Sequence, residues 1–428
     1  MIEVHVTAEN PWPNRVMLRD FSATLFLMLA CAVALAAQPL QAWIDAAPAG
    51  SVLRLPPGTY SGPASIAKPM VVDGGGRVTV DGGGHGTVLT IRGERVVLRG
   101  LTLTNSGGSH DSLDGGLMIE GRDHVVENNV IENVLFGISL HRANDNLIRN
   151  NRIRSRPVDS ADRGDGIRIW YSTGNRIEGN DIAVIRDLTV SNAPRNRFIG
   201  NTVRDSRRAL NLLFSHRTVI AGNVFDHNST GVVALNSDGL IIRDNRILHA
   251  MDASGAGVAL KETAAALVQG NEIIHCAHGI MADSPSNPLS RIVLVDNVIA
   301  HNVTGIYIYG VKGGHLAIGN TFRSNLWPVT IIGDGDPLND FWFANHWDDY
   351  QGFDRDGDGF GDTPHELYAW ADRLWMEFPA AKFFRNSPVL ELLDFLERLA
   401  PFSTPSLILQ DRNPRMAPSV PATKAVIP

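Results

Sequence analysis

An acidic stretch near the C-terminal end of the chain has the spacing of a calcium-binding loop. It begins at Asp354 and reads Asp-Arg-Asp-Gly-Asp-Gly-Phe-Gly-Asp. Carboxylates at loop positions 1, 3, 5 and 9, with glycine at position 6, match the front of an EF-hand loop, in which oxygen ligands surround Ca²⁺. The predicted ligands of a structural calcium ion are Asp354, Asp356, Asp358, Phe360 and Asp362. Because His365 replaces the usual glutamate at position 12, a solvated acidic turn is the alternative.

A second group with metal-binding chemistry is a set of four histidines, each four residues after a recurring asparagine. They are His227, His249, His275 and His301. If successive repeats stack in register, their side chains form one column with steps of about 4.8 Å. Cys276, His278 and Met281 add further soft ligands, which suit copper. Polar residues at a repeated turn also stack through register alone, and the spacing does not give the direction of the side chains. We therefore keep copper as a candidate metal ion but assign no residues to it.

The third kind of chemistry is that of a polysaccharide lyase or glycosidase, which needs paired carboxylates, or a carboxylate and a base, in a groove. The candidate residues are His110, Asp111, Asp114, Asp162, Asp165, Arg207 and Arg208. Acidic turns and loops account for them equally well, so we assign no catalytic residue and expect a protein that is not an enzyme. No phosphate-binding Gly-Lys-Ser/Thr loop occurs, so the chain is not itself an ATPase.

The histidine column is placed by a repeat of about 22 residues, which lengthens to 26 or 29 where a loop is inserted. Its recurring asparagines are Asn129, Asn151, Asn180, Asn201, Asn223, Asn245, Asn271, Asn297 and Asn320. A fixed period of this size indicates stacked repeats. Each repeat holds three short stretches rich in Val, Ile and Leu, which are too short for helices. The sequence therefore predicts an all-β protein, a right-handed parallel β-helix with three short strands in each coil.

The asparagines and glycines of the repeat have separate expected roles. An inward asparagine at a tight turn tolerates a left-handed backbone and can bond its amide to the coils on either side. A glycine follows eight residues after several of them, at Gly137, Gly231, Gly279 and Gly305. We expect these glycines to serve the same left-handed turn.

The N-terminal segment has the pattern of an export signal. An apolar run from Phe21 to Ala37 follows Arg15 and Arg19 and contains an Ala-Leu-Ala cleavage motif. We predict a signal peptide over residues 1–36, with translation starting at Met17. An uncleaved anchor is the alternative, since the run is marginal in length for a membrane span.

The remaining boundaries follow from composition. We expect the β-helix to cover residues 37–345, and a cap with the acidic loop and an amphipathic helix over Leu390–Leu399 to cover residues 346–412. The tail over residues 413–428 is rich in proline and alanine and is expected to be disordered. A net charge of -7 without a basic run argues against a nucleic-acid surface. Only two cysteines are present, one of them in the signal segment, which excludes a disulfide framework.

The cap carries the most specific resemblance. Its segments are Asn345–Asp354, Leu374–Met376, Phe383–Pro388 and Leu393–Phe402. Together with the asparagine repeat, they resemble the NosD family, periplasmic maturation proteins of nitrous oxide reductase. The resemblance implies a periplasmic assembly factor that works with the membrane subunit and the ATPase of an ABC transporter in building the copper–sulfide centre. Nitrous oxide reductase itself, or a copper chaperone, is a further implied partner.

Aromatic and methionine side chains after Leu374 have the composition of an interface centre. The predicted partner-binding residues are Trp375, Met376, Phe383, Phe384, Leu393 and Leu396. Packing of this segment on the last coil is the alternative. For the whole protein, the alternative function is that of an epimerase or lyase of acidic polysaccharides, against which the negative net charge weighs.

Overall fold

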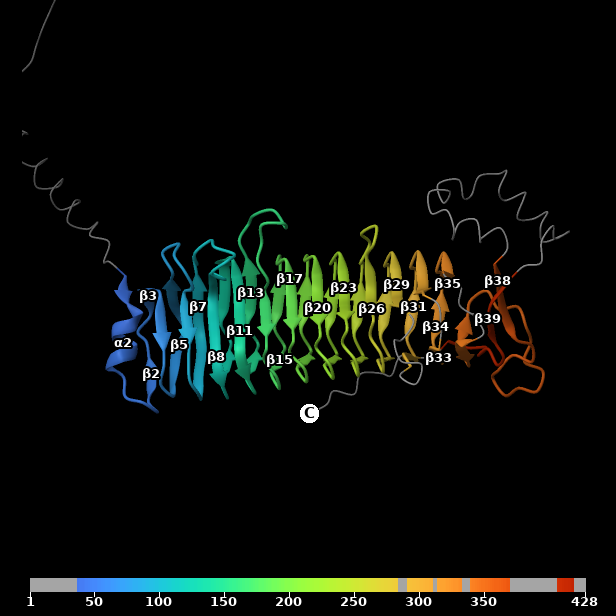
Figure 1. Cartoon of the computed structure of the whole chain (residues 1–428), viewed down its shortest axis with the longest axis horizontal. Coiled ribbons are helices and arrows are strands. Elements are labelled where there is room, and N and C mark those ends of the chain that lie inside the picture. Colours follow the sequence, from blue (N-terminus) through green and yellow to red (C-terminus); the bar gives the residue numbers. More distant parts are fainter. Residues whose placement is uncertain (1–36, 284–290, 311–313, 333–338, 370–405, 419–428) are drawn as a thin grey trace, which may run out of the picture. The chain divides into compact units, whose positions relative to one another are not determined.

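A computed structural model describes residues 37–283, 291–310, 314–332, 339–369 and 406–418. Within the compact unit Pro39–Pro428, the described residues form a right-handed parallel β-helix of about 13 turns (Figure 1). One short helix, α2 (Leu40–Ala46), lies at its start. The predicted fold class is therefore confirmed.

Each coil contributes one strand to each of three columns. The first column contains β2 (Val52–Arg54), β9 (Val125–Glu127), β12 (Leu147–Arg149), β15 (Arg176–Glu178), β18 (Arg197–Ile199), β21 (Val219–Ala221), β24 (Ile241–Arg243), β27 (Leu267–Gln269), β30 (Val293–Val295), β33 (Leu316–Ile318) and β36 (Phe341–Phe343). The second contains β3 (Gly58–Ser61), β10 (Val130–Val134), β13 (Arg152–Ser155), β16 (Asp181–Ala183), β19 (Thr202–Arg204), β22 (Val224–Asp226), β25 (Arg246–Leu248), β28 (Glu272–Ile274), β31 (Val298–Ala300), β34 (Thr321–Arg323) and β37 (His346–Trp347). Two longer strands, β5 (Met70–Asp81) and β7 (Val96–Thr104), serve both columns, and β1 is Gln38–Pro39.

The third column forms a separate 12-stranded sheet. Its strands are β4 (Ala64–Ile66), β6 (Leu89–Ile91), β8 (Gly115–Arg122), β11 (Phe136–Asn144), β14 (Ile167–Trp170), β17 (Asp187–Ser191), β20 (Arg208–Leu213), β23 (Thr230–Leu235), β26 (Ala256–Lys261), β29 (His278–Asp283), β32 (Thr304–Tyr309) and β35 (Trp327–Ile332). Two further strands, β38 (His365–Ala369) and β39 (Ser406–Asp411), follow the coils.

The coil around Asn223 shows how the core is built. Its three strands, β21, β22 and β23, turn Ile220, Phe225 and Val232 inward, where each is at most 2% exposed. Their register partners in the next coil are Ile242, Ile247 and Val258. Alternate residues of a strand face opposite sides, so in-register stacking places apolar residues over apolar residues along the whole core.

The asparagine of each coil bonds to the coils on both sides. Asn223 Oδ1 accepts from Asn201 N at 2.8 Å and from Asn201 Nδ2 at 3.0 Å. Asn223 Nδ2 donates to Phe198 O at 3.0 Å and to Asn245 Oδ1 at 2.9 Å. This asparagine ladder, in which every rung both donates and accepts, continues from Asn129 to Asn345 as the sequence predicts.

The left-handed positions differ from the expected ones. The residue before the asparagine has positive φ, 64° at Gly222 and 56° at Asp244. The glycine eight residues after the asparagine is needed for a different reason: a Cβ on Gly231 would lie 2.4 Å from Gly257 O and 2.6 Å from Ile247 Cγ2. The prediction for Gly137, Gly231, Gly279 and Gly305 was therefore wrong in its cause, because these glycines permit close contact between coils.

The ladder ends on a residue that lies 66 positions further along the chain. Asp411, at the end of β39, is fully buried, and its Oδ2 accepts from Asn345 N at 3.0 Å, Asn345 Nδ2 at 2.9 Å and Trp347 Nε1 at 3.2 Å. β39 pairs parallel with β36 and antiparallel with β38. The β-helix is thus completed by a strand beyond Asn345, where the sequence analysis ended it.

Two parts of the predicted cap have different outcomes. Arg415 N donates to Asn345 O at 2.8 Å and Met416 N donates to Gly359 O at 3.0 Å, so the expectation of disorder from residue 413 onward is wrong for residues 413–418. The other part of the cap, the amphipathic helix expected over Leu390–Leu399, lies outside the described residues. The same holds for the predicted signal segment over residues 1–36. Within the described ranges, no helix has the length and hydrophobicity to cross a membrane.

Candidate functional site

The four histidines of the repeat form one stacked column. The ring centroids of His227 and His249 lie 4.3 Å apart, and the next two steps, to His275 and then His301, are 5.5 and 5.2 Å. The rings point outward: 61% of the His227 side chain and 40% of the His249 side chain are exposed. The structure therefore confirms the stacking and settles the direction that the spacing left open.

The backbone explains why the rings lie in line. Each of the four histidines follows a strand of the second column and has a φ between 52° and 57°. Among residues with a side chain, histidine is one of those enriched in this left-handed region. His227 N donates to Leu248 O at 3.2 Å and His249 N donates to Ile274 O at 3.1 Å. These bonds between coils fix the spacing of the column.

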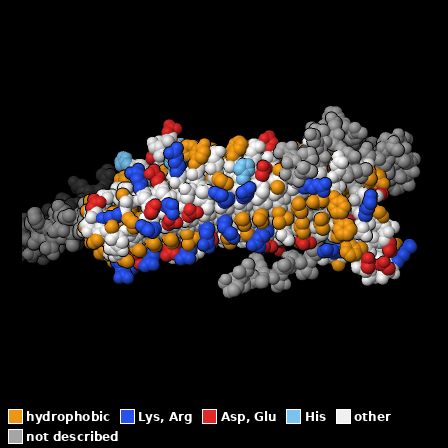
Figure 2. Space-filling model, turned by 60° about the horizontal axis from the view of Figure 1, so that its bottom comes forward, with side chains coloured by type: hydrophobic (Ala, Val, Ile, Leu, Met, Phe, Trp, Pro, Cys, Tyr) orange, Lys and Arg blue, Asp and Glu red, His pale blue; other side chains and the backbone are white. Residues whose placement is uncertain are grey.

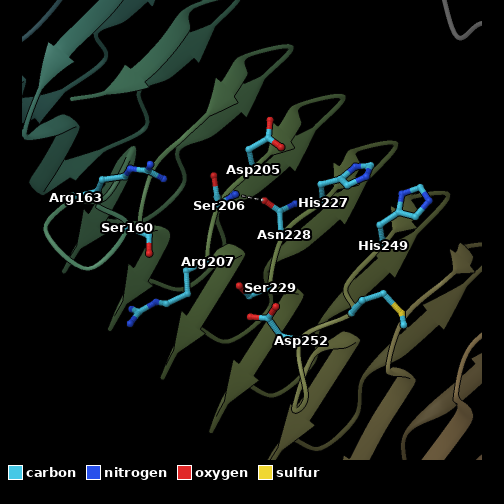
Figure 3. Close-up of a pocket in the computed structure, with 11 residues that line it drawn as sticks. Ser160, Arg163, Asp205, Ser206, Arg207, His227, Asn228, Ser229, His249 and Asp252 are labelled. Atoms are coloured by element: carbon cyan, nitrogen blue, oxygen red, sulfur yellow. Dashed lines mark hydrogen bonds between the residues drawn. The ribbon is translucent and has the colours of Figure 1, made fainter. Parts of the chain in front are cut away.

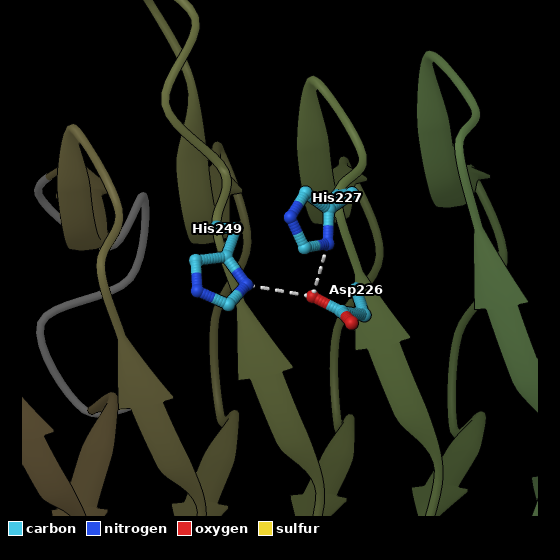
Figure 4. Close-up of side chains that lie close together, drawn as sticks. All are labelled: Asp226, His227 and His249. Carbon is cyan, nitrogen blue, oxygen red and sulfur yellow. Dashed lines mark hydrogen bonds and ion pairs between the residues drawn. The ribbon is translucent and has the colours of Figure 1, made fainter.

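Asp226 joins the first two histidines. Its Oδ1 lies 2.8 Å from His227 Nδ1 and 2.8 Å from His249 Nδ1, so two rings from adjacent coils converge on one carboxylate (Figure 4). The repeat spacing does not single out Asp226, although this acidic residue directly precedes the first histidine of the column. The residues in register with Asp226 on the next three coils are Leu248, Ile274 and Ala300. Only the first pair of rings therefore has a carboxylate at this position.

An open groove of about 500 Å³ lies beside these two histidines. Further residues that line it are Ser160, Arg163, Asp205, Ser206, Arg207, Asn228, Ser229, Met251 and Asp252 (Figure 3). The groove carries both signs of charge, and the side chain of Met251 is largely exposed there. It can therefore admit a small polar molecule, or the side chain of a partner, next to the histidine pair.

The soft ligands that the sequence places near His275 do not join the column. Cys276 is fully buried between coils, and its N–H donates to Asn302 Oδ1 at 2.8 Å. Burial raises the pKa of its thiol to about 12, so the sulfur stays protonated at neutral pH. A thiolate copper site does not fit this arrangement. An ion bound by imidazole nitrogen and carboxylate oxygen fits the Asp226, His227 and His249 cluster.

The acidic loop brings three of its five predicted ligands together. Oxygen atoms of Asp354, Asp356 and Asp358 lie within 4.8 Å of one another. Asp354 is anchored by three backbone donors, Gly357 N at 2.7 Å, Asp358 N at 3.2 Å and Gly359 N at 2.9 Å, and both glycines have positive φ.

The other two predicted ligands of the loop have partners of their own. The carboxylate of Asp362 accepts from Arg355 N at 2.8 Å. The backbone of Phe360 forms an isolated antiparallel β-bridge with that of Arg415. The turn is thus preformed, and the clustered oxygens of Asp354, Asp356 and Asp358 are the ones close enough together to share an ion.

The catalytic candidates are held in local contacts. Asp165 is buried beside Arg186, with Oδ1 3.2 Å from Nη2, and burial raises the pKa of this carboxyl. Arg207 and Arg208 both contact the buried carboxylate of Asp187.

The remaining candidates lie apart from this network. Asp114 accepts from Ser109 N at 2.9 Å, and His110 packs edge-on against Phe136. Asp111 and Asp162 are exposed in loops. Ion pairing and loop structure therefore account for these residues.

Apolar side chains gather on the wall of the first column toward the C-terminal end of the β-helix (Figure 2). The outward residues there are Val293, Val295, Leu316, Ile318, Phe341 and Phe343. Phe341 is 50% exposed and stacks on Phe343, with ring centroids 6.1 Å apart. The six partner-binding residues predicted from the sequence, Trp375, Met376, Phe383, Phe384, Leu393 and Leu396, lie outside the described residues.

Comparison with solved structures shows the fold. The mannuronan C-5 epimerase AlgE6 A-module of Azotobacter vinelandii matches with a TM-score of 0.51 and 15% identity, covering 69% of this chain and 92% of that one. A PL6 alginate lyase in complex with a trisaccharide matches with a TM-score of 0.51 and 13% identity, covering 72% and 81%. At this level of identity the likeness concerns the β-helix alone.

Comparison of sequences finds similarity to one family. The family model described as "Periplasmic copper-binding protein (NosD)" matches residues 153–352, which include the histidine column. A "Probable ABC transporter binding protein NosD" of Pseudomonas aeruginosa is 25% identical over 362 residues, covering 80% of this chain and 83% of the relative. A protein of the same name from Stutzerimonas stutzeri is 25% identical over 383 residues, covering 85% and 86%. The chain is therefore similar to the NosD family, over residues 153–352 in the family model and over most of its length in these two relatives.

Proposed function

We propose that this protein is a non-enzymatic periplasmic accessory of an ABC transporter that acts in maturation of the copper–sulfide centre of nitrous oxide reductase. The observation that carries the proposal is the similarity to two relatives named as probable ABC transporter binding proteins, over four-fifths or more of this chain. The description of the matched family as periplasmic and copper-binding supports the compartment and the metal. Residues 1–36 would direct export and be removed.

The segment of residues 370–405 is the proposed contact with the membrane subunit of the transporter. It lies in the sequence between β38 and β39, and these two strands pair with each other. The last bonds of the asparagine ladder run to Asp411, which lies outside this segment. The exposed pair Phe341 and Phe343 lies on β36, next to β39, and adds apolar surface at the same end.

Replacing residues 370–405 by a short glycine-containing turn tests this contact. Truncation before Leu374 would also delete Asp411, whereas an internal replacement keeps the β38–β39 hairpin and the end of the ladder. We expect a folded protein with a melting temperature near that of the parent, which no longer copurifies with the membrane subunit. The reductase from such a strain should lack its copper–sulfide centre and keep its other copper site.

A double substitution in two exposed loops serves as the control for this experiment. Asp111→Asn with Asp162→Asn alters two exposed loop carboxylates and should leave copurification intact. The docking proposal fails if the replaced protein still copurifies and the reductase matures normally.

We further propose that Asp354, Asp356 and Asp358 hold a structural calcium ion. An ion that binds only the folded state stabilises it, by about 2.7 kcal/mol at a free concentration 100 times the Kd. Calcium should therefore raise the melting temperature of the parent, and Asp356→Asn with Asp358→Asn should remove the gain. The double variant Asp111→Asn and Asp162→Asn, with the same change in charge, should retain it. An unchanged melting temperature on adding a chelator to the parent would show a turn without an ion.

Polysaccharide lyase or epimerase activity is the alternative to an accessory role. It predicts that the purified protein generates unsaturated uronates, or changes the uronate composition, when incubated with an acidic polysaccharide. We expect neither product, because the buried carboxylates of Asp165 and Asp187 are paired with arginines. Turnover lost on Asp165→Asn would support the enzyme and contradict the accessory role.

A further inference from the structure

We propose that Asp226, His227 and His249 form an exchangeable binding site for one divalent transition-metal ion, with copper(II) as the favoured ion. The site rests on its own geometry, and only the choice of copper as the ion handled in the cell rests on the proposed function.

The three side chains already converge on one point. Both Nδ1 atoms lie 2.8 Å from Asp226 Oδ1, and the three ligand atoms lie within 4.8 Å of one another. Metal–nitrogen and metal–oxygen bonds in such sites are about 2.0–2.2 Å long. An ion between the three atoms therefore needs them to separate by only a few tenths of an ångström. Small rotations of exposed side chains supply that movement.

The backbone prepares this convergence. His227 and His249 occupy equivalent turns on adjacent coils, and hydrogen bonds between those coils hold the turns in register. Asp226 lies at the end of β22, directly before the turn. The step between these two rings is 4.3 Å, shorter than the 5.5 and 5.2 Å steps further along the column, where apolar residues are in register with Asp226. Three ligands therefore meet at the His227 end of the column, where Asp226 contacts both rings.

Exposure indicates an ion that can enter and leave. The side chains of His227, His249 and Asp226 are 61%, 40% and 32% exposed. Three ligands on one side leave the remaining coordination positions to water or to a group from a partner, as in metal sites that keep an open position. The adjoining groove gives such a group access from the side of Met251 and Asp252.

The donor atoms select the class of ion. Two imidazoles and a carboxylate suit copper(II), nickel(II) and zinc(II), and copper(II) binds most tightly to a given site of this kind among the divalent first-row metals. The thiol of Cys276 is buried and faces the interior, which leaves this cluster without the thiolate that favours copper(I).

The test is a titration of the purified mature chain, stripped of metal, with copper(II). Excess calcium is present to compete at the acidic loop. Calorimetry should show one saturable equivalent, and electron paramagnetic resonance should show nitrogen coupling from two imidazoles. Asp226→Asn and His249→Gln should each lower the affinity at least tenfold. His301→Gln is the matched control: it has the same turn and column, but Ala300 precedes it in place of an aspartate, and its affinity should equal that of the parent.

Three results would overturn the site. They are the absence of a saturable equivalent in the parent, equal affinities of the parent and Asp226→Asn, and an equal loss in His301→Gln and His249→Gln. Tighter binding of zinc than of copper would overturn the choice of ion. Copurification with the transporter is a separate measurement, so a protein that binds no copper but still copurifies refutes the metal site and leaves the proposed function standing.

Discussion

Asn223→Leu should lower the free energy of unfolding by roughly 2–6 kcal/mol, because two buried groups lose their partners at about 1–3 kcal/mol each. These groups are Asn201 N, which donates to Asn223 Oδ1, and Phe198 O, which accepts from Asn223 Nδ2. Leucine has a similar size but offers neither atom. The asparagine is 1% exposed, so water cannot replace its bonds without opening the coil.

Urea unfolding followed by circular dichroism would measure this effect, with Arg243→Lys as the control. Arg243 is about half exposed and its side chain pairs with the neighbouring Asp244 on the surface, so its replacement should change stability by a few tenths of a kcal/mol. Since each coil of a repeat protein contacts its neighbours alone, hydrogen exchange should show the loss centred on the coils of Asn201 and Asn245. Equal unfolding midpoints for the two variants would contradict a stabilising ladder.

Asp411→Ala should be the most damaging change at the C-terminal end, with a loss on the order of 3 kcal/mol. It removes the acceptor of three buried donors: Asn345 N, Asn345 Nδ2 and Trp347 Nε1. Trp347 stacks on Phe322 at 4.2 Å and on His365 at 4.7 Å, so loosening of the indole affects both the last coil and β38. Tryptophan fluorescence and a thermal scan would report the change.

Asp411→Asn is the conservative partner of that variant. Asparagine keeps an acceptor oxygen and is the residue of every rung from Asn129 to Asn345. We expect its stability to lie within about 1 kcal/mol of the parent, near the ordinary net value of one hydrogen bond. If alanine and asparagine at position 411 behaved alike, the contact with Asn345 would be incidental to closure.

The sequence predicts those features that repeat. The spacing of the asparagines fixes the coil, and alternation around Ile220 and Phe225 fixes which residues are inside. The same spacing placed the four histidines in one column. It did not give their direction, because a left-handed residue at a corner turns its side chain away from the alternation of the strands.

Features that occur once were harder to predict. Asp411 closes the ladder from 66 residues away, and its strand precedes no further repeat. The register pairs Asp411 with Trp342, an inward strand position of the first column, and not with a rung asparagine, so the repeat does not indicate it. Asp226 was missed because a single carboxylate gains its meaning only when the register brings His249 beside it.

Because of the asparagine ladder, the β-helix can be lengthened or shortened only by complete coils. Every rung from Asn129 to Asn345 presents the same donors to one side and the same acceptor to the other. Deleting one complete coil would therefore rejoin equivalent rungs, whereas deleting half of one would leave none matched. Asp411 ends the series because its carboxylate accepts the last bonds and has no N–H to offer to another coil. Whole-coil duplication or loss is thus an evolutionary route open to this scaffold, and the acidic last rung ends the series without a side-chain donor for a further coil.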